Sequence, residues 1–405
     1  MARPLPSDPL LRQLIARAQA AQVGRRRLLQ LGAAGAGALT LAACASPSGS
    51  PTSGGGGGES LIWANWSGYM DEDDNGDYPT LEGFEQQTGI QVAYKVDVDD
   101  NDTFYAKILP LLNSGQFTGY DVACLTDWKV GEMVRANQVL KLDHSKIPNF
   151  KNLNPALIDV DFDPGRDYTM TWQSGYAGLV YNKELVPGGI KSVSDLWKPE
   201  FAGKVVVLSE MRDTIGVIML GQGVDISSKD WGDDEFYNAL DLYKAQLASG
   251  QIGSVKGNSY TDDLENEDAV VGIVWSGDVQ AILNYDDEQN GIDPRFEFVI
   301  PDAGGTLWSD NFIALAGSEK LDLTEQLINY YYDPEVAATL AAWVNYITPV
   351  VGAKEAMESI DAELVDNPLI FPTDEDLAKV KMFRTLTDQE AKDYSSAWAD
   401  ANVGA

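Results

Sequence analysis

LIWA at residues 61–64, IQVAYKV at 90–96 and YDVACL at 120–125 are the three apolar runs that decide the fold. Each run is short and rich in β-branched or aromatic residues, which is typical of strands. The segments at 80–88 and 102–112 lie between them and predict helices, and a third helix follows the last strand. Because strands that alternate with helices form parallel sheets, this order predicts a βαβαβ unit and a mostly parallel, helix-covered sheet.

A second series of the same kind follows further along the chain. It consists of strands at 204–208, 269–275 and 296–300, helices at 214–220, 236–248 and 334–343, and an extended segment at 306–316. Pro334 stands in the first turn of its helix, where a missing backbone N–H is tolerated. Neither series contains a Gly-rich phosphate loop. Two α/β units of this type predict an α/β fold of two lobes, with a cleft between them where ligands usually bind.

The chain is strongly acidic. Its 405 residues contain 29 Lys and Arg against 62 Asp and Glu, one His and two Cys, and 44% are hydrophobic, enough to build a core. Residues 59–405 carry 23 basic and 61 acidic side chains. A surface this acidic repels nucleic acid and anionic lipid headgroups and attracts cations into a cleft. With His144 as the one histidine, a His-rich metal site is excluded.

The N-terminus has the features of an exported lipoprotein. RRRLLQ at 25–30 fits a twin-arginine (Tat) signal, and the apolar run at 28–43 is too short for a confident transmembrane helix. LAAC at 41–44 resembles a lipobox, in which Cys44 becomes a lipidated N-terminus after cleavage. We therefore expect residues 1–43 to be a signal peptide. The alternative is an Ala-rich helix that ends in an unrelated Cys.

Residues 44–58 contain Ser, Pro and a run of five glycines, a composition typical of a flexible tether. The mature protein is then expected outside the cytoplasm, in the periplasmic space or at the outer face of the cell membrane, held by its lipid alone. Cys124 has no partner left for an internal disulfide and is expected to be buried as a small hydrophobic residue.

Six motifs occur in order along the chain: NWSGY at 65–69, NDTFYAK at 101–107, YDV at 120–122, DLWKPE at 195–200, VGIVWSG at 271–277 and GGTLWSD at 304–310. This combination resembles the bacterial spermidine/putrescine-binding protein family, the solute-binding lipoproteins of ABC importers. The resemblance extends from Leu61 to about Trp398. It implies a two-lobed type II periplasmic solute-binding fold, with crossover hinge segments and a ligand cleft between the lobes. The limits it suggests are 59–170 and 309–350 for lobe 1, and 171–308 and 351–405 for lobe 2.

The resemblance also implies a set of binding residues. A polyamine is a methylene chain with ammonium groups, so its receptor needs aromatic walls and carboxylates. The implied aromatic residues are Trp66, Tyr69, Trp128, Trp275, Trp308 and Tyr346. The implied polar residues are Thr126, Glu210, Asp213 and Asp310, and this chain adds Asp127 as a further carboxylate. Each has a plainer alternative: the aromatic residues pack a lobe, and Glu210 and Asp213 stabilise a helix start.

Residues 71–82 form an acidic insertion, DEDDNGDYPTLE, that departs from the family. Its pattern satisfies a calcium loop, D-x-[DN]-x-[DN]-G-x5-E. The ligands would be Asp71, Asp73, Asn75, Asp77 and Glu82. Pro79 and the absence of a predicted helix before the loop favour the alternative of a solvated acidic loop. No other cofactor is expected.

The function predicted from these residues is binding without catalysis: capture of spermidine or putrescine and its delivery to the permease subunits of an ABC importer. The alternatives are a surface-anchored glycosidase, because Trp residues with acid pairs also suit sugars, and a receptor of the same fold for another small solute. Arg384 is the residue that fits least, since it aligns loosely with a polar position of the cleft. Either this alignment is wrong or Arg384 pairs with a neighbouring acid.

Overall fold

The computed structural model describes residues 59–73, 76–284 and 293–403. The predicted signal peptide, Cys44 and the tether lie outside the described residues. No helix among the described residues is both long enough and apolar enough to cross a membrane.

The first unit has the βαβαβ order that the sequence predicts. It is built from β1 (Ser60–Trp66), α2 (Pro79–Thr88), β2 (Gln91–Val98), α3 (Asn101–Asn113), β3 (Val122–Thr126) and α4 (Asp127–Arg135). β1 lies between β2 and β3 and pairs with both in parallel. Local chemistry sets the helix starts: Pro79 opens α2, and the Asp100 side chain accepts a hydrogen bond from the backbone N–H of Thr103 at the start of α3.

The second unit repeats this arrangement with β7 (Val205–Leu208), α5 (Met211–Gly221), α6 (Asp233–Ala248), β8 (Ile252–Lys256), α7 (Tyr260–Glu265) and β9 (Val271–Trp275). β7 lies between β8 and β9 and pairs with both in parallel. The strand β8 was not predicted. Asp213 lies in the first turn of α5, and Glu210 is the residue that caps this helix.

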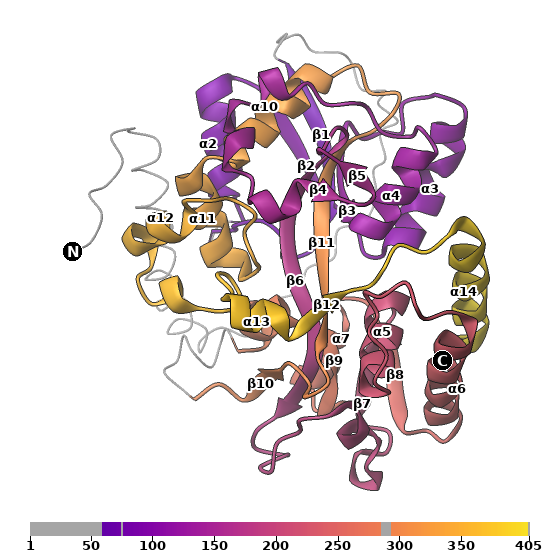
Figure 1. The fold of residues 1–405 in the computed structure, drawn as a ribbon. Helices are drawn as coiled ribbons and strands as arrows, with labels where there is room; N and C mark the ends of the chain where they lie inside the picture. The colour runs from indigo at the N-terminus through magenta and orange to yellow at the C-terminus, as the bar shows by residue number, and fades with distance from the viewer. Residues whose placement is uncertain (1–58, 74–75, 285–292, 404–405) are drawn as a thin grey trace, which may run out of the picture.

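Two long strands connect the units (Figure 1). They are β6 (Thr169–Asn182) and β11 (Gly305–Ala314), which run antiparallel to each other and to their outer neighbours β9 and β3. The strand order β2-β1-β3-β11-β6-β9-β7-β8 makes one continuous sheet. The prediction of a mostly parallel sheet therefore holds within each unit, whereas the centre of the sheet is antiparallel. In this register Asp310 lies opposite Thr126 on β3 and Gln173 on β6.

The remaining elements complete the layers around the sheet. They are β4 (Asp159–Val160), β5 (Asp163–Pro164), α8 (Ser276–Asp278), β10 (Phe296–Val299), α10 (Leu321–Tyr331), α11 (Pro334–Val344), α12 (Ala353–Ile360), α13 (Asp374–Ala378), β12 (Val380–Met382) and α14 (Asp388–Ala401). In Figure 1, α10, α11 and α12 lie beside the first unit, and α14 lies beside α6 of the second.

The described residues form two separate hydrophobic cores, and the long strand β6 contributes Trp172 to the first and Leu179 to the second. The first core contains Trp63, Phe84 and Phe312, and the second contains Val206, Phe236 and Tyr394. Two cores are the packing expected of two lobes. The predicted lobe limits stay a prediction, but Met357 and Ile370, which that division gives to lobe 2, pack in the first core.

The buried position predicted for Cys124 agrees with the structure, and three tryptophans outside the predicted binding set also pack in a core. Cys124 is free of any disulfide and buried in the first core. Trp231 and Trp398 are buried in the second core, and Trp197 packs against it. These tryptophans therefore stabilise the fold and do not line the site.

Candidate ligand-binding site

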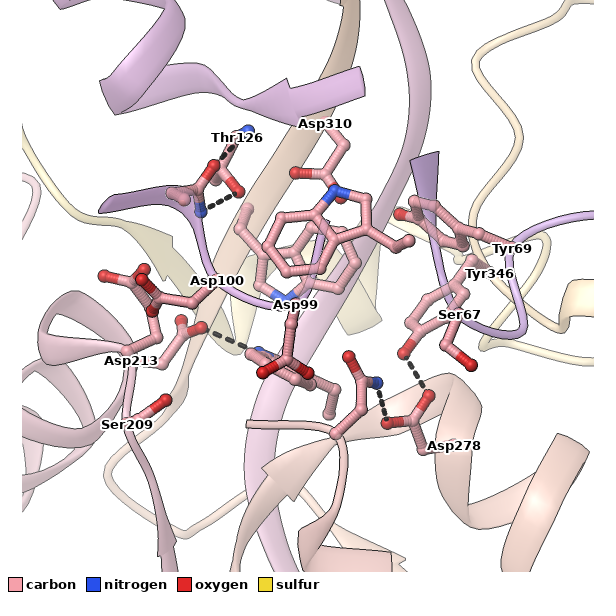
Figure 2. A pocket seen from close by; sticks show the side chains of 16 residues that line it. Ser67, Tyr69, Asp99, Asp100, Thr126, Ser209, Asp213, Asp278, Asp310 and Tyr346 are labelled. Carbon is pink, nitrogen blue, oxygen red and sulfur yellow. Dashed lines mark hydrogen bonds between the residues drawn. The ribbon is translucent and has the colours of Figure 1, made fainter. Parts of the chain in front are cut away.

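A cavity lies between the two units, at the carboxyl ends of their parallel strands. Trp66 ends β1, Trp275 ends β9, and Ser209 follows β7. The sixteen residues that line the cavity are Trp66, Ser67, Tyr69, Asp99, Asp100, Asn101, Thr126, Ser209, Glu210, Asp213, Asn258, Trp275, Asp278, Trp308, Asp310 and Tyr346 (Figure 2). This is the edge of an α/β sheet where ligands usually bind.

Nine of the eleven predicted binding residues line this cavity: Trp66, Tyr69, Thr126, Glu210, Asp213, Trp275, Trp308, Asp310 and Tyr346. Asp127 and Trp128 are the two that do not. The structure thus brings together residues from β1, β3, α5, β9, β11 and the segment after α11. Their roles in ligand binding stay predictions.

The aromatic wall consists of rings packed edge to face. Tyr346 lies at the centre, with its ring centroid 5.5 Å from that of Tyr69 and 5.2 Å from that of Trp308. Glycines make room for it: a Cβ atom on Gly175 would lie 2.6 Å from Trp308, and one on Gly277 would lie 2.6 Å from Tyr346. These contacts are shorter than side chains tolerate. Gly277, the last residue of the VGIVWSG motif, is therefore required by the Tyr346 ring that packs on it.

Asp310 is a buried acid with one unpaired oxygen. It is 5% exposed, and its Oδ1 atom has no hydrogen-bond partner among the described residues. Burial raises the pKa of Asp310 to about 7; the polar side chains of Thr126 and Tyr69 oppose this shift, and the nearby carboxylates of Asp127 and Asp213 add to it. A cation that entered the cavity would offset this burial of negative charge.

Asp213, in contrast, is held by two internal donors. Its Oδ2 atom accepts a hydrogen bond of 2.8 Å from the indole Nε1 of Trp275, and its Oδ1 atom accepts one of 2.5 Å from the Thr306 hydroxyl. Figure 2 shows the first of these bonds inside the cavity. Burial raises the pKa of Asp213, and the two donors oppose this shift. Asp213 therefore orients Trp275 in addition to its place in the wall.

Glu210 lies at the start of α5 and caps this helix, as the alternative interpretation of this residue predicts. Its side chain accepts a hydrogen bond of 3.2 Å from the backbone N–H of Arg212. Burial raises the pKa of Glu210 to about 8, while the Arg212 charge opposes this shift. The same residue also lines the cavity. Capping and ligand contact are thus compatible at this position.

The sequence interpretation missed several residues of the cavity. Asp278 accepts hydrogen bonds of 2.8 Å from the Tyr346 hydroxyl, 2.7 Å from the Tyr260 hydroxyl and 3.0 Å from the Asn258 amide. Asp278 directly follows the VGIVWSG motif, so its acid was visible in the sequence. The other missed lining residues are Ser67, Asp99, Asp100, Asn101, Ser209 and Asn258.

Asp99 and Asp100 follow β2 and line the cavity (Figure 2). The last residue of β2, Val98, pairs with Trp66 at the end of β1. The place of the two acids after a predicted strand was the available signal for them.

Asp127 and Trp128 lie outside the cavity lining, and their role in binding stays a prediction. Asp127 Oδ1 accepts a hydrogen bond of 2.6 Å from the backbone N–H of Trp128, at the start of α4. Burial raises the pKa of Asp127 to about 7. The ring of Trp128 is covered by the Arg212 guanidinium, whose Cζ atom lies 3.7 Å from the ring centroid. Arg212 belongs to the second unit, and its guanidinium lies over the Trp128 ring, which does not line the cavity.

The acidic insertion is organised by hydrogen bonds. Asp71 is 6% exposed; its Oδ2 atom accepts a hydrogen bond of 2.8 Å from the backbone N–H of Thr80, and its Oδ1 atom bonds the Thr80 hydroxyl. Asp73 Oδ1 accepts a hydrogen bond from the backbone N–H of Asp77. Asn75 lies outside the described residues, and the described ones contain no group of three acidic, His or Cys side chains arranged to hold a metal. The calcium interpretation stays a prediction. In the structure, the Asp71 carboxylate accepts hydrogen bonds from Thr80 at the start of α2.

Arg384 does not line the cavity. Its guanidinium pairs with Glu390 at 2.7 Å and lies 3.8 Å from the ring centroid of Trp231. The second of the two explanations therefore holds: Arg384 pairs with a neighbouring acid. His144 stacks on Phe150 and is likewise absent from the cavity.

The two units, the antiparallel connecting strands and the cavity between the cores define an extracytoplasmic solute-binding protein. The family model described as "Bacterial extracellular solute-binding protein" matches residues 80–372, and the chain belongs to this family. Membership confirms the prediction of a binding protein that is not an enzyme, and it removes the glycosidase alternative.

Named relatives and a solved structure agree with this assignment. The chain is 29% identical over 295 residues to the spermidine/putrescine-binding periplasmic protein 1 of Haemophilus influenzae, covering 72% of this chain and 77% of that one. It is 27% identical over 334 residues to the spermidine/putrescine-binding periplasmic protein of Escherichia coli, covering 82% and 88%. A putative spermidine/putrescine ABC transporter structure from Listeria monocytogenes matches with a TM-score of 0.72 and 25% identity, over 86% of this chain and 100% of that one.

Proposed function

We propose that this protein captures a linear polyamine, spermidine or putrescine, and delivers it to an ABC importer. One observation carries the proposal: the cavity combines five aromatic side chains of the predicted set with buried carboxylates, and its sixteen lining residues, all of them described, include no Lys or Arg. An amine chain matches this lining, because methylene groups pack on rings and ammonium groups pair with carboxylates.

Other solutes match the lining less well. An amino acid would bring a carboxylate into a wall that holds Glu210, Asp213, Asp278 and Asp310. A neutral sugar would leave the carboxylate of Asp310 buried without a counter-charge. Since a buried charge is costly unless it is paired, a ligand with two or more positive charges suits this cavity best. The names of the Haemophilus and Escherichia relatives support the same choice.

We further propose that the mature chain acts at the outer face of the membrane, attached through a lipid on Cys44 after twin-arginine export. The support is the sequence RRRLLQ followed by LAAC.

The ligand proposal is tested by the melting temperature of the purified mature domain with putrescine, spermidine, arginine, glycine betaine and glucose. A ligand that binds only the native state adds RT ln(1 + [L]/Kd) to its stability, about 2.7 kcal/mol at 100 times Kd. Isothermal titration then gives the affinities. Stabilisation by a polyamine is expected. Stabilisation by a sugar or amino acid, with indifference to millimolar polyamine, would refute the proposal in favour of another solute.

A further inference from the structure

The two ends of the sheet meet at the cavity. In the strand order β2-β1-β3-β11-β6-β9-β7-β8, β2 and β8 are the outermost strands, and the connecting strands β11 and β6 lie at the centre. The turn after β2 contains Asp99 and Asp100, and the turn after β8 contains Gly257 and Asn258. Three of these residues, Asp99, Asp100 and Asn258, line the cavity together with Asp310 of β11 (Figure 2). The cavity therefore lies between a connecting strand and two turns that come from opposite ends of the sheet.

Gly257 contacts the first unit directly. A Cβ atom at this position would lie 3.2 Å from the backbone oxygen of Asp99, and 3.8 Å from the hydroxyl of Ser209 in its own unit. The first distance is shorter than nearly all real Cβ contacts, and a backbone oxygen cannot rotate away as the end of a side chain can. The φ angle of Gly257 is not positive, so the turn itself does not require a glycine. The absence of a side chain is required by the neighbouring unit.

A ligand reaches the cavity only if the two units separate. Asp213, Asp278 and Asp310 in its wall are each 5% exposed. Because each unit has its own hydrophobic core, a rotation about the connecting strands leaves both cores intact. The outermost strands lie three strand spacings, or roughly 14 Å, from the connecting pair. At this distance a gap of about 1 Å between the turns corresponds to a rotation of about 4°.

We propose that Gly257 is a positioning residue, which sets how closely the two units close over the ligand. The proposal rests on the proposed polyamine function. With no side chain at Gly257, the turn after β8 contacts the backbone of Asp99, and the ligand is enclosed. A larger side chain there acts as a wedge between the two turns. Since the escape of a buried ligand depends on the closed state, the wedge raises the dissociation rate and leaves the association rate nearly unchanged.

The test is stopped-flow fluorescence and isothermal titration of putrescine and spermidine with the wild type, Gly257→Ala and Gly257→Val. Gly257→Ala adds one methyl group, which a shift of a few tenths of an ångström accommodates, so its dissociation rate should rise by about threefold or less. Gly257→Val adds two further methyl groups, and the rate should rise by about tenfold or more for both amines. The melting temperature of the unliganded variants should match that of the wild type, because opening of the units removes the clash.

Two other glycines of the second unit provide matched controls. Gly253 on β8 also faces a backbone oxygen, but this oxygen belongs to Gly203 of the same unit, and a Cβ atom would clash with it. Gly253→Ala should therefore lower the melting temperature and leave the dissociation rate of the folded protein near the wild-type value. Gly188 is exposed, and a Cβ atom there would meet no atom of the described residues within 4 Å. Gly188→Val should change neither quantity.

The results separate the two proposals. A Gly257→Val protein with wild-type dissociation rates for both amines would overturn the inference about Gly257. The inference would also fail if Gly257→Val lowered the melting temperature as much as Gly253→Ala, because Gly257 would then stabilise the fold of its own unit. A wild type that binds neither amine would overturn the polyamine function itself.

Discussion

Replacing Asp310 with Asn should change ligand binding and protein stability in opposite directions. Asp310 is buried, its Oδ1 atom has no partner among the described residues, and burial raises its pKa to about 7. In the unfolded chain an Asp has a pKa of about 3.9. Between these two values the native state holds a proton that the unfolded state has lost, so the stability of the protein falls as the pH rises from about 4 to 7.

The size of this effect follows from the two pKa values. A difference of about three corresponds to on the order of 4 kcal/mol of lost stability above pH 7. Asn carries no charge and avoids this loss, although its buried amide leaves a donor to satisfy, which costs about 1–3 kcal/mol. We therefore expect Asp310→Asn to raise the free energy of unfolding of the unliganded protein by about 1–3 kcal/mol at pH 8, with the gain shrinking toward pH 4.

Binding should respond in the other direction. If Asp310 pairs with an ammonium group that every linear polyamine presents, Asp310→Asn weakens putrescine and spermidine together. Breaking a buried ion pair costs about 3–5 kcal/mol, and even about 1.4 kcal/mol is a tenfold loss of affinity.

The assays are thermal unfolding of the unliganded protein between pH 4 and 8 and titration with both amines. Asp213→Asn is the control from the same cavity, because both Asp213 oxygens already accept hydrogen bonds from Trp275 and Thr306. Its amide cannot accept both bonds, so this variant should be less stable than wild type. An Asp310→Asn variant that melts below wild type at pH 8, or that keeps wild-type affinity for both amines, would refute this reasoning.

Three other predictions concern charge, anchoring and the acidic insertion. Because the pKa values of Asp310 and Glu210 are raised to about 7 and 8, a bound polyamine should cause both acids to lose their protons. The affinity for the polyamine should therefore rise from pH 6 to 8.5. The apparent binding enthalpy at pH 7 should also vary with the ionisation enthalpy of the buffer, because the buffer takes up the released protons. Cys44→Ala should abolish incorporation of a radioactive fatty acid, and equal labelling of both proteins would contradict the lipobox. Asp71→Ala should lower the free energy of unfolding by about 1 kcal/mol, the usual contribution of a helix cap, because Asp71 accepts a hydrogen bond at the start of α2. Chelator should leave the melting temperature of both proteins unchanged. A chelator-dependent fall in the wild type alone would instead support calcium binding by the insertion.

Most elements of the two units were predictable because each has its own local pattern, with β8 and α7 of the second unit as the exceptions. The apolar runs of β1, β2 and β3 are bounded by polar helix starts, so periodicity alone separates them. The connecting strand β6 was missed for a physical reason. Nearly all residues from Thr169 to Asn182 are buried on both faces of the sheet, so the segment lacks the alternation of a half-exposed strand. Its glycines, among them Gly175, also lower its apparent strand propensity.

Two contacts near the site could not be predicted from the local sequence. The ring of Trp128, which the resemblance implies in the binding wall, is covered by Arg212 from another unit of the fold. The calcium interpretation, which counts Asp71 as a ligand, stays a prediction, and in the structure the Asp71 oxygens accept hydrogen bonds from Thr80, nine residues further on. Neither contact leaves a trace in the local sequence.

The acids of the cavity belong to two kinds, and the distinction explains how one wall can be both rigid and selective. Asp213 and Asp278 have their oxygens occupied by donors of the protein, and in return they fix the rings of Trp275 and Tyr346. Their burial is compensated within the fold, so they define the shape of the cavity. Asp310 has an oxygen without such a donor. A cation bound between the two units pairs with the buried charge of Asp310 and lowers its free energy. A neutral molecule of the same shape cannot offer this electrostatic stabilisation. Shape is therefore set by the first kind of acid, and the requirement for positive charge by the second.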